Sequence, residues 1–209
     1  MITSRALVSE RAPLADFVRF KNDYGVEVSE LDEAWDLALT EAAERARAAG
    51  RADLTDYLTL RRNNDLARTI AKDWLLDTFA MLAGEANLAG AGINISREGE
   101  HRFKIGNASM VGSSLSLAKG VRAVIVEVGW PRVPRDGFIK GGGLALANIR
   151  HVGRKSANAT LRLIVEADGP PRWMLEDRHG EIKTEFHEDD LSNHITVFLD
   201  HHREHRPRS

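Results

Sequence analysis

The chain contains no cysteine, which excludes disulfide bonds and any chemistry that depends on a thiolate. It has no uninterrupted apolar run close to the roughly 20 residues that a membrane-spanning helix needs. The first residues, MITSRALVSERAP, contain no long apolar segment followed by a cleavage site, so they do not resemble a secretory signal peptide. We therefore expect a cytoplasmic protein that has no membrane partner.

Several familiar catalytic signatures are also missing. The chain has no Gly-x-Ser-x-Gly pattern, which the nucleophile elbow of the α/β-hydrolases requires. It has neither a dinucleotide-binding glycine fingerprint nor the GxxxxGK[ST] sequence of a phosphate-binding P-loop. We expect no cofactor, and any phosphate chemistry would have to use another arrangement of residues.

The net charge of −2 conceals a strong segregation of charge along the chain. Residues 130–165 contain seven Lys and Arg residues but only one acidic residue. Residues 166–200 contain ten Asp and Glu residues but only three basic ones. The net charge of the whole chain therefore says little about its partners. The basic segment is the best indication of a charged partner.

Residues 1–90 have the apolar periodicity of helices and form the first of two predicted subdomains. We predict helices over 5–22, from a capping pattern at Ser29 to a stop at Gly50, over a short stretch near 53–60, and over 64–83. Glycines from residue 84 onward mark a change of period. We therefore place the boundary with a second subdomain, 91–209, near residue 90. The alternative is one continuous core.

Residues 91–209 have the short alternating runs of β-strands. The strongest run is 121–128, whose four valines favour a pleated strand. We predict strand, turn and strand over 93–105, further strands over 109–118 and 160–166, a hairpin over 173–186, and a helix over 189–202. The predicted fold is α+β: an N-terminal helical layer, an antiparallel β-sheet or partial barrel of about six to eight strands, and a C-terminal helix.

The glycine triplet Gly141-Gly142-Gly143 supports two interpretations. Its bare backbone amides could surround a phosphate. Alternatively, the glycines form a bend that leads into the next strand. Residues 144–151 alternate as a strand would, and a short helix after the glycines is the other reading of that stretch.

The basic segment carries the residues that we predict to contact a partner or an anion. Arginine makes bidentate contacts to phosphate, and aromatic faces stack on nucleobases. The predicted partner-binding residues are Trp130, Arg132, Arg135, Lys140, Arg150, His151, Arg154 and Lys155, with Phe138 and Arg162 in the same segment. Two alternatives stand beside external binding: the basic side chains pair internally with the acidic segment 166–190, or the two unlike patches drive self-association.

One enzymatic alternative uses Glu127 and His151. Glu127 lies among valines, so it needs a basic partner such as Arg122 or Arg132 if it is buried. A paired Glu127 would be structural. An unpaired carboxylate close to the imidazole of His151 would form an acid–base pair.

A second enzymatic alternative centres on Glu181-Ile182-Lys183, with Asp168 and Asp177 upstream. Carboxylates on a strand beside a lysine can hold Mg²⁺ and orient a water for attack on a phosphodiester. The triplet resembles the motif of the PD-(D/E)xK nucleases, and the resemblance implies that reaction. The competing interpretation is alternating surface charge on a hairpin.

Two histidines near the end of the chain provide a metal-binding alternative. His201 and His205 have the i, i+4 spacing that places two ligands on one helical face. The sequence fixes no third ligand beside them. We therefore expect no metal site.

These patterns together predict a non-enzymatic binding or interaction protein, whose sheet presents a basic surface to a protein or nucleic-acid partner. The first alternative is an enzyme that acts on a phosphate-containing substrate, as a nuclease or another hydrolase. The second is an oligomeric scaffold that unlike charge patches hold together. In the binding hypothesis, Arg150→Glu with Arg154→Glu should abolish partner binding and leave the melting temperature nearly unchanged, whereas a large loss of stability would show that these arginines are structural.

Overall fold

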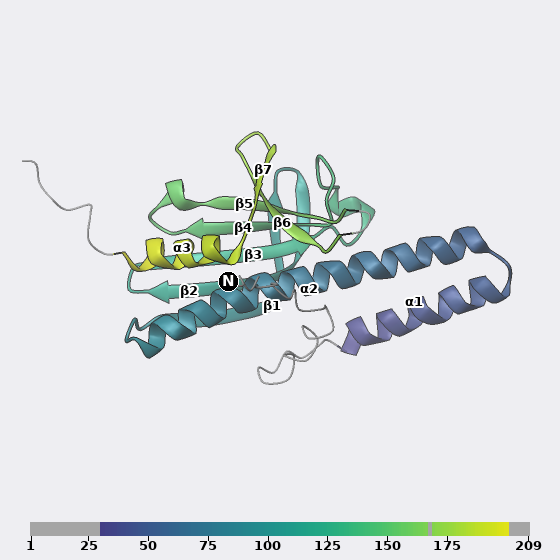
Figure 1. Cartoon of the computed structure of the whole chain (residues 1–209), viewed down its shortest axis with the longest axis horizontal. Helices are drawn as coiled ribbons and strands as arrows, with labels where there is room; N and C mark the ends of the chain where they lie inside the picture. Colours follow the sequence, from purple (N-terminus) through teal and green to yellow (C-terminus); the bar gives the residue numbers. More distant parts are fainter. Residues whose placement is uncertain (1–29, 167–168, 201–209) are drawn as a thin grey trace, which may run out of the picture. The chain divides into compact units, whose positions relative to one another are not determined.

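The computed structural model describes residues 30–166 and 169–200 (Figure 1). Within these ranges, none of the helices combines the length and the apolarity that crossing a membrane would require. The predicted helix over 5–22, the capping residue Ser29, Asp168, and the histidines His201 and His205 lie outside the described residues. The described elements confirm the α+β prediction, because helices come first, then an antiparallel sheet, then a closing helix.

The chain divides into two compact units between Arg62 and Asn63, inside a helix. Unit 1 contains α1 (Glu30–Ala48) and the beginning of α2 (Ala52–Leu88). Unit 2 contains the rest of α2, the whole sheet and α3 (Glu188–Leu199). Helical structure gives way to strands after Leu88, close to the change of period near residue 90.

The predicted stop of the first described helix at Gly50 is confirmed. Gly50 has a φ of +68°, a left-handed conformation that a residue without a Cβ adopts easily. Its N–H donates to the carbonyl of Arg47 at 3.0 Å, and the N–H of Arg51 donates to the carbonyl of Ala46 at 2.9 Å. These two bonds form a Schellman motif, which satisfies the last carbonyls of α1.

α2 is one continuous helix of 37 residues, so the prediction of separate helices over 53–60 and 64–83 was wrong. The run Arg61-Arg62-Asn63-Asn64 suggested a new start, but it contains neither proline nor glycine to interrupt a helix. The side chain of Asn87 ends α2 by bonding to both backbone groups of Ile93, at 2.8 and 2.6 Å.

The sheet has seven antiparallel strands in sequential order, which agrees with the six to eight predicted. The strands are β1 (Asn94–Ile105), β2 (Ala108–Lys119), β3 (Arg122–Trp130), β4 (Ala145–His151), β5 (Ala159–Ile164), β6 (Arg172–Glu176) and β7 (Ile182–Glu185). β1 and β7 lie at the two edges. Short turns join most neighbours, and a long connection of residues 131–144 joins β3 to β4.

Two local predictions in the sheet are resolved by the register. Residues 93–105 were predicted as strand, turn and strand, but β1 is a single strand with a bulge between Glu98 and His101. Pairing with the long strand β2 overrides the local turn signal of Arg97-Glu98-Gly99-Glu100. Residues 144–151 form a strand rather than a helix, since β4 pairs with β3 on one side and β5 on the other.

The larger of two hydrophobic clusters lies on one face of the sheet, where α2 and α3 both contribute to it (Figure 1). Val124, Val126 and Val128 of β3 are fully buried in this cluster, together with Phe79 of α2 and Leu191 of α3. A smaller cluster of Ala108, Met110 and Leu146 lies on the other face. Because successive residues of a strand point to opposite faces, the odd-numbered residues of β3 lie on the other face. That second face carries the polar network described below.

Candidate functional site

β4 separates the predicted partner-binding residues into two groups. Arg132, Arg135 and Lys140 belong to the β3–β4 loop (residues 131–144), whereas Arg154 and Lys155 belong to the β4–β5 loop (residues 152–158). The first loop precedes β4 and the second follows it, so the two loops lie at opposite ends of this strand. The seven residues of β4 span about 20 Å at the usual rise per residue. Arg132, Arg135 and Lys140 therefore lie at one end of β4, and Arg154 and Lys155 lie at its other end.

Three arginines of the β-rich segment pair internally. Arg150 donates from Nε to Oε2 of Glu127 at 3.0 Å. Arg162, only 6% exposed, donates to Glu176, and Arg172 pairs with Glu166 and Glu185. Pairing of the basic segment with the acidic segment thus holds for Arg162, whereas Arg172 belongs to the acidic segment and pairs within it. Arg150 instead uses a neighbouring strand, although half of its side chain stays exposed.

Glu127 is 5% exposed and uses both of its carboxylate oxygens. Oε2 accepts from Arg150, and Oε1 lies 2.8 Å from Nε2 of His101. The other ring nitrogen of His101 lies 3.0 Å from Oε2 of Glu98, and its ring stacks on Phe103. A paired, structural Glu127 is therefore what the geometry favours.

The sequence did not single out His101. The feature that could have identified His101 was the alternation of polar and apolar residues along β1. The turn predicted at 97–100 hid this alternation, because it divided the strand in two. Once β1 is one strand with a bulge, Glu98, His101 and Phe103 follow one another on the polar face of the sheet.

Glu127 and His151 do not meet. The register pairs Val124 with His151 and Glu127 with Asn148. Paired residues share a face of the sheet, so His151 lies on the core face with Val124, and Glu127 lies on the polar face. An acid–base pair of these two side chains has no support in this arrangement.

His151 instead contacts a second histidine that the sequence analysis did not consider. Its Nε2 lies 2.8 Å from Nδ1 of His194 in α3, and the two rings stack with centroids 5.1 Å apart. Burial lowers the pKa of both, and Arg154 lowers that of His151 further; the pKa of His194 falls to about 4. The pair is therefore neutral at pH 7. His194 lies one turn after Leu191 and next to Ile195, on the apolar face of α3. Its position among these apolar residues was the sequence feature that could have predicted its burial.

A small cavity of about 170 Å³ lies next to His151. Its lining includes Arg122 and Arg154 beside Val197 and Phe198. Ligand sites for drug-sized molecules are typically about 300–1,000 Å³, so this cavity is too small for a nucleotide. Nη1 of Arg122 already donates to the carbonyl of Asp200 at 2.7 Å.

Of the nuclease-like hypothesis, the described residues Asp177, Glu181 and Lys183 lie on and around the β6–β7 turn, and Asp168 lies outside the described residues. The carboxylate of Asp177 accepts backbone N–H groups from His179 at 2.8 Å and Glu181 at 3.0 Å, which lowers the pKa of Asp177. Nζ of Lys183 lies 3.7 Å from Oδ2 of Asp177, so the lysine forms an ion pair within the turn. In the two described ranges, no group of three or more potential ligands is placed to hold a metal.

The glycine triplet packs against Arg162. Gly141, Gly142 and Gly143 have φ values of +81°, +85° and +102°. A Cβ at Gly143 would lie 2.8 Å from Cγ of Arg162, closer than real Cβ contacts allow. The next residue, Leu144, donates its N–H to the carbonyl of Leu163 and starts the pairing of β4 with β5. These contacts favour the bend over the phosphate loop.

The β3–β4 loop is built on a short 3-10 turn, Pro134–Asp136. Asp136 is buried, and its Oδ2 accepts the backbone N–H groups of Arg132 and Val133, both at 3.2 Å. This carboxylate is therefore occupied by the loop itself. It does not present its charge to a partner, although it is the one acidic residue of the segment.

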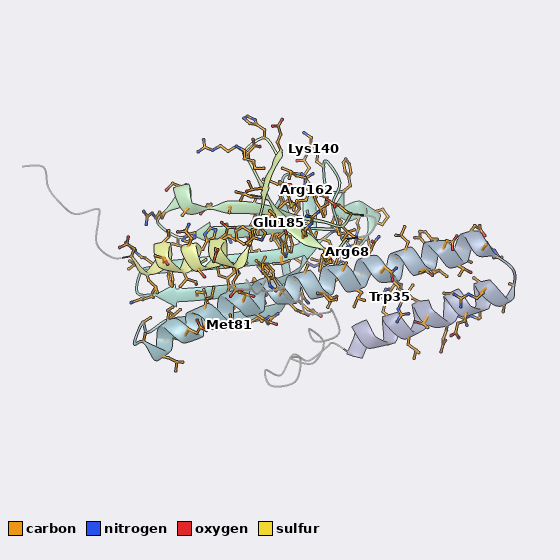
Figure 2. The ribbon with its side chains drawn as sticks, in the orientation of Figure 1. Trp35, Arg68, Met81, Lys140, Arg162 and Glu185 are labelled. Carbon is orange, nitrogen blue, oxygen red and sulfur yellow. The ribbon has the colours of Figure 1, made fainter. Side chains whose placement is uncertain are left out.

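The aromatic residue available for a partner is Phe138 rather than Trp130. The ring of Trp130 is only 4% exposed, and the guanidinium of Arg132 lies over it at 4.1 Å. Phe138 is 80% exposed, and in the sequence it lies between Arg135 and Lys140, whose side chains are also exposed. Figure 2 shows Lys140 extending outward from this loop.

No family model, curated protein or solved structure that was compared with the chain matches it. The function is therefore argued from the β3–β4 loop and its surroundings alone.

Proposed function

We propose that the protein is a non-enzymatic binding protein that recognises single-stranded nucleic acid through the β3–β4 loop. The observation that carries the proposal is the 80% exposure of Phe138 between two exposed basic residues, Arg135 and Lys140. A phenyl ring in this position adds little to the stability of the fold. Its contribution to binding free energy is largest when the ring stacks on another flat, apolar surface.

The charge of the loop supports an anionic partner. Arg132, Arg135 and Lys140 are exposed, while the carboxylate of Asp136 is buried and bonded to backbone amides. The central arginines of the sheet, by contrast, have carboxylate partners inside the fold. Arg135 and Lys140 therefore present positive charge at the surface on either side of Phe138 in the sequence.

The exposed ring selects the single-stranded form of nucleic acid. In a duplex the faces of the bases are stacked and unavailable, whereas an unpaired base can stack on an aromatic side chain. Each such stack contributes about 1–3 kcal/mol, and flanking arginine and lysine residues hold the phosphates. Arg154 and Lys155 of the β4–β5 loop lie at the opposite end of β4 and are not part of the proposed site.

Fluorescence anisotropy with labelled single- and double-stranded oligonucleotides, from low to physiological salt, tests the proposal. We expect tighter binding of the single strand, and a linear fall of log K with log salt concentration. Phe138→Ala should weaken binding at least about tenfold, and Lys140→Glu should also lower the salt slope by about 0.7, the value for one phosphate contact on a single strand.

The β2–β3 turn offers matched controls for both changes. Val121, 94% exposed, is an exposed apolar residue without an adjacent aromatic ring, and Lys119 precedes the same turn. Val121→Ala and Lys119→Glu should leave the affinity within about twofold, because they lie at the opposite end of β3. No binding to any oligonucleotide at low salt, or equal losses in the controls, would overturn the proposal.

A further inference from the structure

The small cavity beside His151 lies at the end of β4 that is farther from Phe138. Residues of the β2–β3 turn, the β4–β5 loop and the end of α3 line it, and these three segments lie at the same end of the sheet (Figure 1). All of them belong to unit 2. Because the length of β4 separates this cavity from the β3–β4 loop, a ligand that fits the cavity does not reach Phe138.

Two arginines give the cavity a positive charge. Of the described residues that line it, Arg122 and Arg154 are basic and none is acidic. Within the two described ranges, the guanidinium of Arg154 has neither a hydrogen bond nor an ion pair. The arginines of the neighbouring strands differ, since Arg150 and Arg162 each pair with a glutamate. Arg154 therefore keeps its donors for an anion from outside the chain.

The positive charge of Arg154 acts inside the cavity. Burial lowers the pKa of His151, and the guanidinium of Arg154 lowers it further. His151 lines the same cavity, is 5% exposed, and forms its ring contact with His194 of α3. The field of Arg154 thus reaches the buried side of the cavity, where water screens a charge less than it does at an open surface.

Arg122 supplies the second positive charge. It is two residues before Val124, so it lies on the core face of β3, beneath α3. Its Nη1 donates to the main-chain carbonyl of Asp200 at 2.7 Å, which holds the guanidinium beside the end of the helix. An arginine has five N–H donors, and this bond uses one of them. Because a carbonyl is neutral, the bond positions Arg122 next to Phe198 without cancelling its charge.

The rest of the lining is mostly apolar. Ala123, Val197 and Phe198 line the cavity from β3 and α3, and Val121 and Val152 line it from the two turns. Val121 is 94% exposed and Val152 is 47% exposed, so both can gain contacts from a ligand. Ligand sites typically combine apolar walls with a few polar groups that fix orientation. This lining therefore suits a molecule that has an anionic head and an apolar group.

We propose that this cavity binds a small phosphate monoester, with the phosphate held by Arg122 and Arg154 and the organic group against the valine side chains. The charge of such an ester at neutral pH, about −2, matches two guanidinium groups. Each guanidinium can hold two phosphate oxygens at once. The volume of about 170 Å³ limits the organic group to a few atoms, since drug-sized ligands occupy about 300–1,000 Å³.

Titration of the ¹⁵N-labelled full chain with n-butyl phosphate, followed by two-dimensional NMR, tests the proposal. We expect the amide signals of Val152, Gly153 and Arg154 to move and to reach saturation. Inorganic phosphate at the same ionic strength should bind at least about tenfold more weakly. The reason is that each buried CH₂ group strengthens binding about fourfold, and we expect at least two to be buried.

Arg154→Gln should weaken the binding of n-butyl phosphate at least about tenfold, because it removes charge-assisted hydrogen bonds to the phosphate. Lys155→Gln is the matched control. Lys155 is the next residue, is also exposed and loses the same charge, but it does not line the cavity. Its substitution should leave the affinity within about twofold. Arg122 is unsuitable for this test, since it also caps α3. Circular dichroism checks the fold of each variant.

Four outcomes would contradict the proposal. Unmoved amide signals with both phosphates exclude an anion site. Butanol that binds as tightly as n-butyl phosphate would show an apolar cavity alone, and butyrate that does so would assign a carboxylate ligand. Equal losses in Arg154→Gln and Lys155→Gln would reduce the effect to the general charge of the β4–β5 loop. Oligonucleotide binding at Phe138 is an independent readout, which Arg154→Gln should leave within about twofold.

Discussion

Unit 1 and unit 2 differ in how they use apolar residues. In unit 2, long side chains from α2, α3 and the core face of the sheet are buried, Leu75, Phe79 and Leu191 fully. In unit 1, the described large residues are mostly exposed, and Leu39 is the only large apolar side chain among them that is buried. The difference indicates that most of the buried apolar packing of the described residues, and with it most of their stability, lies in unit 2.

Removing a large core side chain is the strongest test of this comparison. Phe79→Ala should lower the free energy of unfolding by about 3–5 kcal/mol, since it removes a fully buried ring and leaves a cavity. Denaturant unfolding followed by circular dichroism measures the loss. Leu39→Ala should leave this transition within about 0.5 kcal/mol, because unit 1 contributes little to it. Equal losses in the two variants would show that both units unfold as one.

The buried Arg162–Glu176 pair predicts the next largest effect. Each side chain is 7% exposed, so Glu176→Leu would leave an unpaired cation in unit 2 and cost about 3 kcal/mol. Combining Glu176→Leu with Arg162→Met should recover most of the loss, because both desolvated charges are then gone. Chemical denaturation of the single and double variants measures the recovery. A double variant as unstable as the single one would mean that Arg162 acts mainly by supporting the glycine bend.

Acid should destabilise unit 2 through the histidine pair. The folded-state pKa of His194, about 4, lies below its ordinary value of 6.5, so the unfolded chain binds this proton first as the pH falls. The contribution of His194 is complete above pH 6.5 and is lost from there down to pH 4, by about 2 kcal/mol at pH 5. The lowered pKa of His151 acts in the same direction.

Unfolding experiments from pH 7.5 to pH 4.5 measure this dependence. His194→Gln removes the group that must stay neutral, so its stability should fall less steeply with acid than that of the parent chain. Two parallel pH profiles would mean that other groups cause the dependence.

The smallest predicted effect is local to the β3–β4 loop. Asp136→Ala removes the acceptor of two backbone N–H groups and should cost about 1 kcal/mol. Asp136→Asn retains an acceptor oxygen and should cost less. Thermal unfolding measures both, and oligonucleotide binding should weaken more in Asp136→Ala, since the loop then loses its fixed shape. A cost as large as that of Phe79→Ala would show that the loop belongs to the core.

Local signals predicted the order of elements well and their continuity less well. The helix α1 ended before Gly50 as expected, and the valine-rich run at 121–128 became most of β3, apart from Val121, which lies in the preceding turn. The two errors, in α2 and in β1, have the same cause. Each contains a short polar or glycine-containing run that reads locally as a boundary, and packing or pairing over a longer distance continued the element through it.

The sequence by itself determined the fold class, the meander of strands and the position of the charge-rich segment, because periodicity and turn residues act over a few neighbours. Only the tertiary structure decided which charges and rings face outward. Glu127 with Arg150, and Arg162 with Glu176, are partners because of strand register, which no local pattern encodes. The same register buried Trp130 and His151, whereas Phe138 is exposed in the loop between β3 and β4, outside any strand.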